Sequence, residues 1–455
     1  MHGLVIALLT QIFVVEYLVE RRGLLHPYFV LIPELLSAIV MLVVLLRLMN
    51  GARCYFDWRY GVFLLVLLFT IAFGYAVQDV PTGAMLAGVR SYVKFLPFFL
   101  LPAVHRFTPR QLQTQLAFLL VLAVLQTPLA FYQRFVEFAA SMHTGDQVRG
   151  TLTTSSALSM FLICAIAGVV VAYLHGRIRL AKMLGLAAWL FAATTINETK
   201  ATLLLLPIAL VVPALTMPGK GHVVRRLLPI AAVAALGVTA FGLVYNYMMA
   251  DYASPISEFF TNTDRLTYYL YTGAANTDQP YVGRFDSIEI ALEHTTQDAV
   301  TLAFGFGAGN VSESFLPEFD GKYADYYLRF GVGQTQVTQW LWEIGFVGLL
   351  TYLFLFYLVF RDSLTVARSK DVMAPVGQLW TVAMIVVTFG LIYKSVFSMN
   401  DFAYPFWYFA GVVASRAVVV RQAARKRVRQ LPPSWRLAAG EPRAPSGPDG
   451  GVAWR

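Results

Sequence analysis

Long apolar stretches recur along this chain and constrain its fold more than any other feature. Each holds about 20 residues with few charges, which as an α-helix is long enough to cross a bilayer's hydrocarbon core. Lipid offers backbone groups no hydrogen bonds, so a spanning segment must satisfy its own, as a helix does. The sequence therefore predicts an all-α polytopic membrane protein with about twelve transmembrane helices. The stretches are residues 3–20, 28–48, 60–77, 88–104, 112–133, 155–175, 180–197, 201–217, 227–249, 336–360, 376–398 and 402–420.

Composition supports this class. Of 455 residues, 58% are hydrophobic and only 13% are charged, and the mean hydropathy is +0.61. Soluble domains carry about twice that share of charge. The stretches 88–104 and 180–197 are the least regular, because Arg90 and Lys94 interrupt the first and Glu198 and Lys200 follow the second.

Basic residues in short loops predict the orientation, since Lys and Arg collect on the cytoplasmic side. They follow the even-numbered spans, and a basic tail follows the twelfth. Both termini are therefore expected in the cytoplasm, where the basic loops would meet anionic lipid. Arg21 and Arg22 are exceptions on the outer side. The basic loop residues are Arg47, Arg53, Arg59, Arg106, Arg110, Arg177, Arg179, Lys182, Lys220, Arg225, Arg226, Arg361, Arg368 and Lys370.

The same pattern divides the chain into four parts. Residues 1–249 hold spans one to nine, and residues 250–335 form one large outer loop. Residues 336–420 hold spans ten to twelve, and residues 421–455 form a basic tail. Proline, glycine and charge dominate the end of that tail, which predicts a disordered segment.

The outer loop differs in charge from the rest of the chain. It carries twelve acids against four bases, a net charge of −8, whereas the whole protein is +9. The basic balance thus belongs to the expected cytoplasmic side, and nothing in the sequence indicates a nucleic-acid partner.

An amphipathic helix is expected within the outer loop, after Gly283. Phe285, Ile288, Leu292 and Ala299 recur near one face at helical spacing. A glycine-rich turn, "FGFGAGN", and an aromatic stretch, "YADYYLRF", come next.

Cations near the outer ends of spans are the best candidates for a functional site, because charge in a membrane is costly unless it is paired or used. Arg90 and Lys94 are four residues apart on one helix face, and Lys200 lies at the mouth of a span. Arg284 begins the amphipathic helix, where the helix dipole also favours an anion. Such a cluster suits an anionic group at head-group level, such as a lipid-linked pyrophosphate. Alternatively, each cation reaches lipid phosphate or pairs with an acid, as Lys200 could with Glu198.

Other chemistry lacks support in the sequence. Arg134 has Glu137 three residues on, which explains it without a substrate, and it is left out of the predicted site. Cys54 and Cys164 are expected at different depths, which argues against a disulfide or metal pair. No nucleotide motif, metal cluster or serine triad is apparent. The sequence predicts neither a metal nor a cofactor.

Several short motifs resemble the O-antigen polymerase and O-antigen ligase family of bacterial membrane glycosyltransferases. The main one is "QTQVTQWLWEIGFVG", which ends an outer loop and contains Glu343, Gly345 and Gly348. "GRFDSIEIALEH" and "FGFGAGN" are similar to the family's Gly-Arg, helix and glycine-rich turn. "VRSYVKFLPFFLLP" and "NETKATLLLLPIA" resemble two of its spans, the second with Lys200 where Arg is usual.

One departure from the family pattern favours a polymerase over a ligase. Many members, ligases above all, carry His-Asn at the start of the late helix, where this chain has Gln334 and Thr335. Glutamine cannot accept a proton as histidine can. A small-solute or polysaccharide transporter is a third reading, since twelve spans with both ends inside would look similar.

The resemblance implies metal-independent, inverting glycosyl transfer on the outer face of the bacterial inner membrane. Its substrates would be undecaprenyl-pyrophosphate-linked glycans, polymerised for an O-antigen, capsule or exopolysaccharide. A flippase and a chain-length regulator would be partners. Arg284, Arg90 and Lys200 would then stabilise the departing pyrophosphate.

The resemblance also suggests residues around the sugars. Five are expected to bind substrate, namely Gln334, Arg329, Lys94, Tyr326 and Glu343. The base is unassigned among Asp286, Glu289, Asp325 and Glu343. A structural role for Glu343 at the helix start is at least as well founded.

Overall fold

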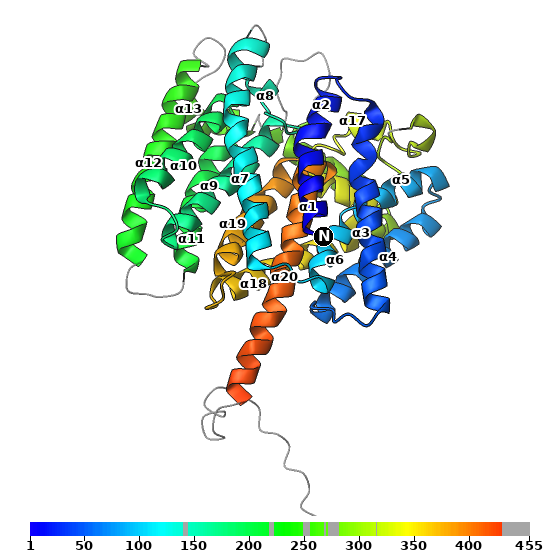
Figure 1. Ribbon diagram of the computed structural model, residues 1–455. Coiled ribbons are helices and arrows are strands. Elements are labelled where there is room, and N and C mark those ends of the chain that lie inside the picture. Colours follow the sequence, from blue (N-terminus) through cyan, green and yellow to red (C-terminus); the bar gives the residue numbers. More distant parts are fainter. Residues whose placement is uncertain are drawn as a thin grey trace, which may run out of the picture.

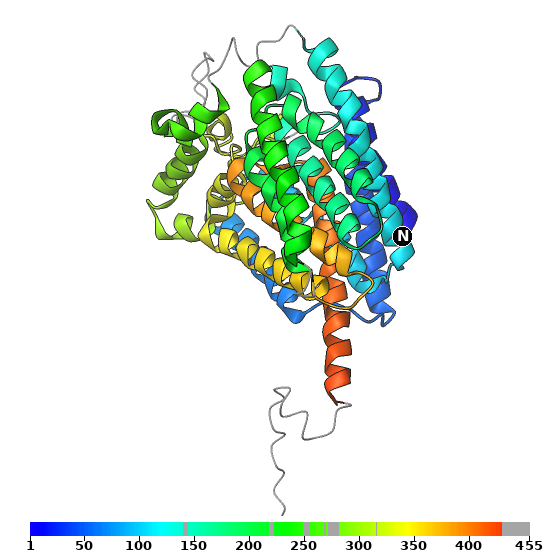
Figure 2. The same cartoon turned by 90° about the vertical axis from the view of Figure 1, so that its left-hand side faces the viewer.

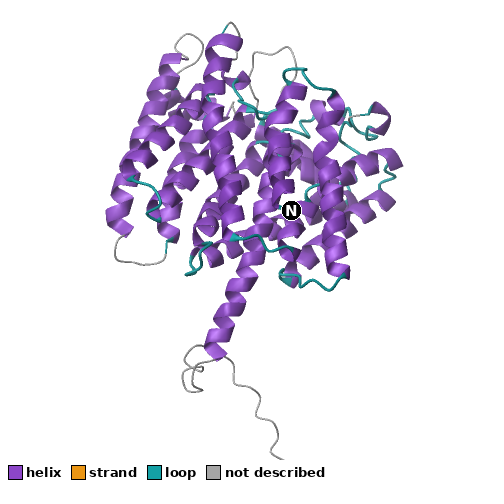
Figure 3. Cartoon of the chain, viewed as in Figure 1, coloured by secondary structure: helices purple, strands orange, loops and turns teal. Residues whose placement is uncertain are grey.

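The computed structural model describes residues 1–139, 144–217, 223–248, 255–267, 270–271, 282–314 and 316–429. Within these ranges every regular element is helical (Figure 3). Among the described residues, nine helices are long and apolar enough to cross a membrane, and a bent pair forms a tenth candidate. The predicted class, an all-α multi-pass membrane protein, is therefore confirmed for the described residues.

The principal helices pack side by side in one bundle (Figures 1 and 2). In chain order they are α1 (His2–Thr10), α2 (Glu16–Glu20), α3 (Ile32–Met49), α4 (Trp58–Val77), α5 (Thr82–Val93), α6 (Leu96–Val104), α7 (Pro109–Tyr132), α8 (Thr144–Gln147), α9 (Ser155–Leu174), α10 (Leu180–Ile196), α11 (Ala201–Thr216), α12 (Val223–Met248), α13 (Ile256–Thr261), α14 (Thr263–Thr267), α15 (Arg284–Thr295), α16 (Ala299–Phe304), α17 (Tyr326–Arg329), α18 (Gln336–Ala367), α19 (Ala374–Tyr393) and α20 (Asn400–Arg429). Short η elements join several of these: η1 (Gln11–Val15), η2 (Pro27–Leu31), η3 (Gln133–Glu137), η6 (Pro317–Phe319) and η7 (Val396–Ser398).

Each predicted span coincides with a helix or a helix pair, but three depart from a single long helix. The stretch 88–104 is the pair α5 and α6, bent by 41°. Helices α10 and α11 have 17 and 16 residues, which is short for a crossing. The bend has a local cause, because Pro97 cannot donate a backbone hydrogen bond to continue α5.

The bundle has two distinct ends. We call the end at which α20 projects the tail face, and the opposite end, where α17 lies, the loop face (Figure 1). Helix α20 contacts the tail-face loops, since Arg416 pairs with Asp371 at 2.5 Å and Arg421 with Asp57 at 3.6 Å. The segment from α13 to α17, between α12 and α18, belongs to the predicted outer loop.

The two arginines that break the predicted charge pattern are both engaged by the protein. Arg22 pairs with Glu137 at 3.0 Å and donates to the hydroxyl of Tyr17 at 2.7 Å. Arg21 donates to the carbonyl of Thr153 at 3.2 Å. Their charge is therefore used in packing, which explains why they lie opposite the other basic loops.

The predicted basic tail begins as a continuation of helix α20. Helix α20 continues through Arg429, so residues 421–429 are helical. The stretch "RQAARKRVR" has no proline or glycine to end a helix, and its residues are mostly good helix formers. The remainder, 430–455, lies outside the described residues.

The expected amphipathic helix is two helices, α15 and α16. Its most buried stripe is Ser287, Ala291 and Thr295. Of the predicted face, Ile288 and Leu292 are partly buried against the same cluster, whereas Phe285 is exposed, so the prediction was partly right. Small residues face inward because α15 packs closely on α18, where the hydroxyls of Ser287 and Thr338 lie 3.0 Å apart.

A buried carboxylate ties α18 to α4 and α20 near the tail face. Asp362 is fully buried and accepts hydrogen bonds from the hydroxyl of Tyr60 at 3.0 Å and from Arg421 at 2.6 Å. Arg361 also donates to it, at 3.0 Å. Removing one partner of such a buried pair leaves the others without compensation.

We expect Asp362→Ala to lower the free energy of unfolding by about 3 kcal/mol, because it removes the acceptor of Tyr60 and leaves Arg421 with its more distant contact to Asp57, at 3.6 Å. Thermal unfolding of the purified protein in detergent measures this. Asp371→Ala is the matched control, since it removes a more exposed Asp–Arg pair and should cost roughly 1 kcal/mol or less. Equal losses in the two variants would contradict the role assigned to Asp362.

Candidate functional site

A polar cavity of about 350 Å³ lies between the α5–α6 bend and the start of α18. The connector from α19 to α20, residues 394–399, closes one side, and residues 312–314 close another. Among the described lining residues, Lys94 is the one with a basic side chain and Glu313 the one with an acidic side chain. The other lining residues are Ser91, Tyr92, Phe95, Ser312, Ser314, Tyr327, Gln336, Gln339, Trp340, Tyr352, Phe397, Ser398 and Trp407.

Lys94 is held in the cavity wall by polar partners on two other helices. It ends α5 just before the bend, and its side chain is only 12% exposed. Its Nζ donates to Oδ1 of Asn400 at 2.7 Å and lies 3.8 Å from Oε1 of Glu34. Asn400 in turn donates to Glu16 at 3.1 Å. A lysine this enclosed presents its charge in a fixed direction.

Arg90 lies one turn before Lys94 and shares its acid. Its guanidinium is 43% exposed and contacts the same Glu34 oxygen at 2.7 Å. The structure thus brings Arg90 and Lys94 together as predicted from their spacing. We call these two residues the first cation pair.

Arg284 and Lys200 form a second group of cations. Arg284 donates from Nε to the carbonyl of Tyr393 at 3.0 Å, and its guanidinium lies 4.3 Å from the centre of that ring. Burial lowers the pKa of Lys200, and the positive charge of Arg284 lowers it further, while Asp146 opposes the shift. We call Arg284 and Lys200 the second cation pair.

Glu198 interacts electrostatically with Lys200, as the sequence allows, and it forms an ion pair with Arg134. The distance is 2.5 Å and both side chains are largely enclosed. Burial raises the pKa of Glu198, although Arg134 acts against that change. Arg134, set aside from the sequence, therefore belongs to the surroundings of the second cation pair.

The connector between α19 and α20 links the two pairs. The carbonyl of Tyr393, the last residue of α19, accepts a hydrogen bond from Arg284. The side-chain oxygen of Asn400, the first residue of α20, accepts one from Lys94. The polar cavity lies along this connector, since Phe397 and Ser398 line it. One cation of each pair thus contacts one end of this connector, and Lys94 is the one of the four that lines the cavity.

Two glutamines of α18 hold the connector in place. The backbone N–H of Phe397 donates to Gln336 Oε1 at 2.8 Å. The hydroxyls of Ser395 and Ser398 donate to Gln339 Oε1 at 2.9 and 3.1 Å. Gln336 and Gln339 are three residues apart, so they share the helix face that lines the cavity.

Glu343 lies behind the cavity and joins three segments. It is 1% exposed, and its Oε2 accepts from the hydroxyl of Tyr92 at 2.6 Å. The Ser312 hydroxyl donates to Oε1. Tyr92 and Ser312 both line the cavity, whereas Glu343 does not. This geometry favours the structural role for Glu343 over direct substrate contact.

The glycine motifs pack against each other and position the cavity wall. Gly345 interrupts α18 with φ 60° and ψ −164°, a conformation that side chains rarely adopt. A Cβ there would lie 2.5 Å from the backbone N of Gly305. The break frees the Trp342 carbonyl, which accepts from Phe306 N at 2.7 Å.

The remaining predicted residues lie outside the cavity lining. Gln334 precedes the helix, and Thr335 caps α18 by accepting from the N–H of Thr338 at 3.0 Å. Arg329 is exposed and stacks beside Phe330. Tyr326 packs in an aromatic cluster, 4.8 Å from the ring of Phe330.

Sequence reasoning missed Tyr327, Gln336, Gln339 and Glu313. Burial and the nearby carboxylates of Glu343 and Glu313 raise the pKa of Tyr327 to about 12, so its hydroxyl stays protonated and can donate. The spacing of the glutamines was a usable signal, because two glutamines three residues apart share one face of an otherwise apolar helix.

The base candidates from the sequence also lie elsewhere. Asp286, Glu289 and Asp325 do not line the cavity. Burial and the charge of Glu289 raise the pKa of Asp286. No cluster of three or more His, Cys, Asp or Glu side chains suited to a metal occurs in the part of the chain that the structure describes.

No protein-family model matches this sequence, and no curated protein matches it either.

Proposed function

We propose that this protein polymerises oligosaccharide repeat units carried on undecaprenyl pyrophosphate. In this proposal the chain crosses the bacterial inner membrane twelve times, with both termini in the cytoplasm and the loop face outside. The observation that carries the proposal is the polar cavity with a cation pair at each end of its connector. The motif resemblance and the predicted orientation support it independently.

Two pyrophosphates must be held in such a reaction, because both the growing donor and the acceptor repeat unit are lipid-linked. Two separate cation pairs match that requirement. We assign the donor pyrophosphate to Lys94 and Arg90, since Lys94 lines the cavity where the sugars would meet. We assign the acceptor pyrophosphate to Arg284 and Lys200.

The chemical step is one substitution at the donor's anomeric carbon. The acceptor hydroxyl oxygen forms a bond to that carbon from the face opposite the pyrophosphate, which inverts the configuration. The carbon–oxygen bond to pyrophosphate breaks, and undecaprenyl pyrophosphate leaves with both electrons of that bond. Lys94 stabilises the added negative charge as it develops.

The cavity also offers groups suited to sugars. Gln336, Gln339, Tyr327 and Ser398 present amides and hydroxyls, which pair with sugar hydroxyls. Trp340 and Trp407 supply apolar ring surface. The Nε1 of Trp407 finds no acceptor among the described residues and is a further donor.

Glu313 is the carboxylate placed to take the proton of the acceptor hydroxyl. Glu313→Gln keeps the shape but cannot accept a proton, so we expect polymer formation to fall by about 10²-fold, the lower range for a lost general base. The rate of repeat-unit consumption measures this. Glu318→Gln is the control, as Glu318 is exposed and outside the lining. An unchanged rate for Glu313→Gln would remove Glu313 from the mechanism.

The function is tested in cells that make the corresponding polysaccharide. Arg284→Ala or Lys200→Ala should leave the protein in the membrane but leave single repeat units on the carrier lipid. Gel analysis of lipid-linked glycan and immunoblotting of membranes give the two readouts. Normal polymer length in both variants would reject the second cation pair as part of the site.

The lowered pKa of Lys200 predicts a pH dependence. A lysine must be protonated to hold pyrophosphate, so activity should fall as pH rises through its pKa, below the ordinary 10.5. Lys200→Arg keeps its charge at those pH values and should move the alkaline fall upward. The pH profile of repeat-unit consumption measures both. Identical profiles would show that Lys200 is not the group that titrates.

A transporter is the second candidate, and the broken helices favour it. Interrupted spans beside a polar cavity are typical of secondary transporters, and both the α5–α6 bend and Gly345 interrupt helices here. The two functions differ in a simple assay. Polymerisation proceeds in detergent without a compartment, whereas transport yields solute movement in vesicles and no new glycosidic bond.

A further inference from the structure

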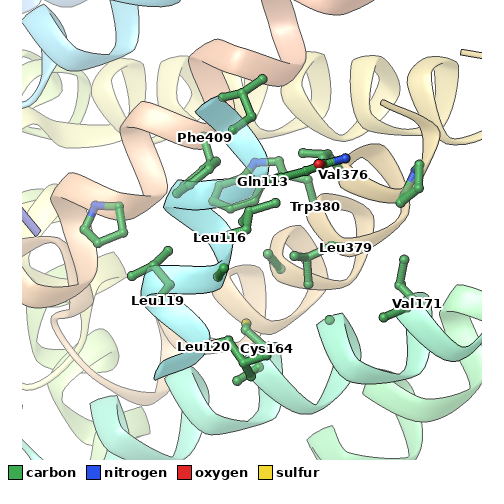
Figure 4. A pocket seen from close by; sticks show the side chains of 18 of the residues that line it. Gln113, Leu116, Leu119, Leu120, Cys164, Val171, Val376, Leu379, Trp380 and Phe409 are labelled. Atoms are coloured by element: carbon green, nitrogen blue, oxygen red, sulfur yellow. The ribbon is translucent and has the colours of Figure 1, made fainter. Parts of the chain in front are cut away.

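A second cavity, of about 440 Å³, lies between α7, α9, α19 and α20 (Figure 4). Its walls are almost entirely apolar, with Leu116 and Leu120 from α7, Cys164 from α9, and Leu379 and Trp380 from α19. It shares no lining residue with the polar cavity. The proposed reaction therefore does not account for it.

The cavity is elongated along the helices. On α9 its lining runs from Phe161 to Ala172, which corresponds to about 17 Å of helix at the usual rise per residue. Half of a bilayer's hydrocarbon core is roughly 15 Å thick. The lining thus extends through about one leaflet, starting from the tail face, where α7 begins at Pro109.

The tail-face mouth of the cavity is positively charged. Arg177 lines it and is exposed, and Arg110 adjoins the lining residue Pro109. The nearby acid, Asp371, is engaged by Arg416, which contacts both carboxylate oxygens at 2.5 and 3.0 Å. Within the described residues Arg177 has no ion pair, so its charge can serve an external anion.

We infer that this cavity binds one acyl chain of an anionic phospholipid from the leaflet at the tail face. The chain would lie along α9, and the phosphate would meet Arg177. Apolar walls of one leaflet's depth fit a hydrocarbon chain, and the unengaged charge at the mouth fits its head group. Gln113, also in the lining, can donate to an ester oxygen.

The bound chain would also support the proposed site. The inner end of the cavity reaches Asp401 and Phe402 at the start of α20. Asn400, which holds Lys94, is the preceding residue. The inference itself concerns lipid binding alone, so it can fail or hold independently of the polymerase proposal.

Cys164 provides a direct probe of occupancy. It lines the cavity, and Cys54→Ser removes the other thiol, which is exposed. We expect phosphatidylglycerol to slow N-ethylmaleimide labelling of Cys164 about tenfold in delipidated protein, and phosphatidylcholine to slow it far less. Arg177→Gln should abolish the difference, whereas Arg179→Gln, an exposed arginine outside the lining, should preserve it. Equal protection by both lipids, or none by either, would overturn the inference.

A substitution that fills the cavity provides a second test of lipid binding. Gly168 lines the cavity and a Cβ there would meet only Leu379 side-chain carbons at 3.7 Å or more, so Gly168→Phe would occupy the space. Native mass spectrometry should show one fewer retained phosphatidylglycerol in this variant. Gly185→Phe is the control, because Gly185 has open space around it. Equal lipid counts would contradict the inference, and Arg177→Gln provides the test if Gly168→Phe does not fold.

Discussion

Replacing Lys94 by alanine is expected to lower polymer formation by about 10²- to 10³-fold, the range for losing one preorganised charge at a reacting group. Lys94 is the cation in the described lining of the polar cavity, and Asn400 and Glu34 fix its direction. The loss should appear in the rate at saturating substrate, because the charge acts most strongly on the departing pyrophosphate.

The fold should survive this change. Glu34 keeps its contact with Arg90 at 2.7 Å, so no acid is left without a cation. Lys182→Ala is the matched control, since Lys182 is an exposed lysine at the start of α10. Repeat-unit consumption and the thermal unfolding midpoint are measured for both variants. A folded Lys94→Ala protein with the parent's rate would contradict the assignment of the donor pyrophosphate.

Replacing Gly345 by alanine is expected to destabilise the protein by at least about 3 kcal/mol and to abolish activity. Two effects add at this position. The left-handed backbone is strained for any side chain, and the new Cβ would lie 2.5 Å from Gly305 N and 2.6 Å from Ala303 O. Both neighbours are backbone atoms, so the turn itself would have to move.

That movement reaches the site through Glu343, two residues earlier. Displacing it would break its bonds to Tyr92 and Ser312, two residues of the cavity wall. Gly305→Ala changes the other side of the contact and should give the same result. Gly61→Ala, in open space on α4, should not lower stability and can raise it by up to about 1 kcal/mol, because alanine is the better helix former. A normal thermal unfolding midpoint for Gly345→Ala would contradict the role of the break.

Hydropathy predicted the membrane helices well because a spanning helix must be long and apolar wherever it packs. It could not predict how the helices break. The bend after Lys94 follows from Pro97, which a hydropathy pattern does not register, and the interruption at Gly345 depends on close packing against Gly305, forty residues away. The face of α15 was only partly predicted, since close packing on α18 places the small residues Ser287 and Ala291 at the centre of the contact and leaves Phe285 exposed.

The site was partly predictable. Arg90 and Lys94 stood out because charges are costly in a span, and their spacing brought them together. Gln334 was chosen for its place in a motif, but Thr335 caps the helix and leaves the cavity to Gln336 and Gln339. Tyr326 and Tyr327 are indistinguishable in sequence. Only the packing of the short helix α17 directs Tyr327 to the cavity and Tyr326 to the aromatic cluster.

The proposed activity is the formation of glycosidic bonds between lipid-linked repeat units. The most direct measurement incubates the purified protein in detergent with undecaprenyl-pyrophosphate-linked repeat units, without metal or nucleotide sugar. Mass spectrometry then follows chain length and free undecaprenyl pyrophosphate. A polymerase should yield chains of two or more repeats, with one undecaprenyl pyrophosphate released for each bond. The repeat units are taken from a strain that makes the polysaccharide, and the protein is shown to be folded. If single repeat units then persist and no carrier lipid is released, the proposed polymerase activity is wrong.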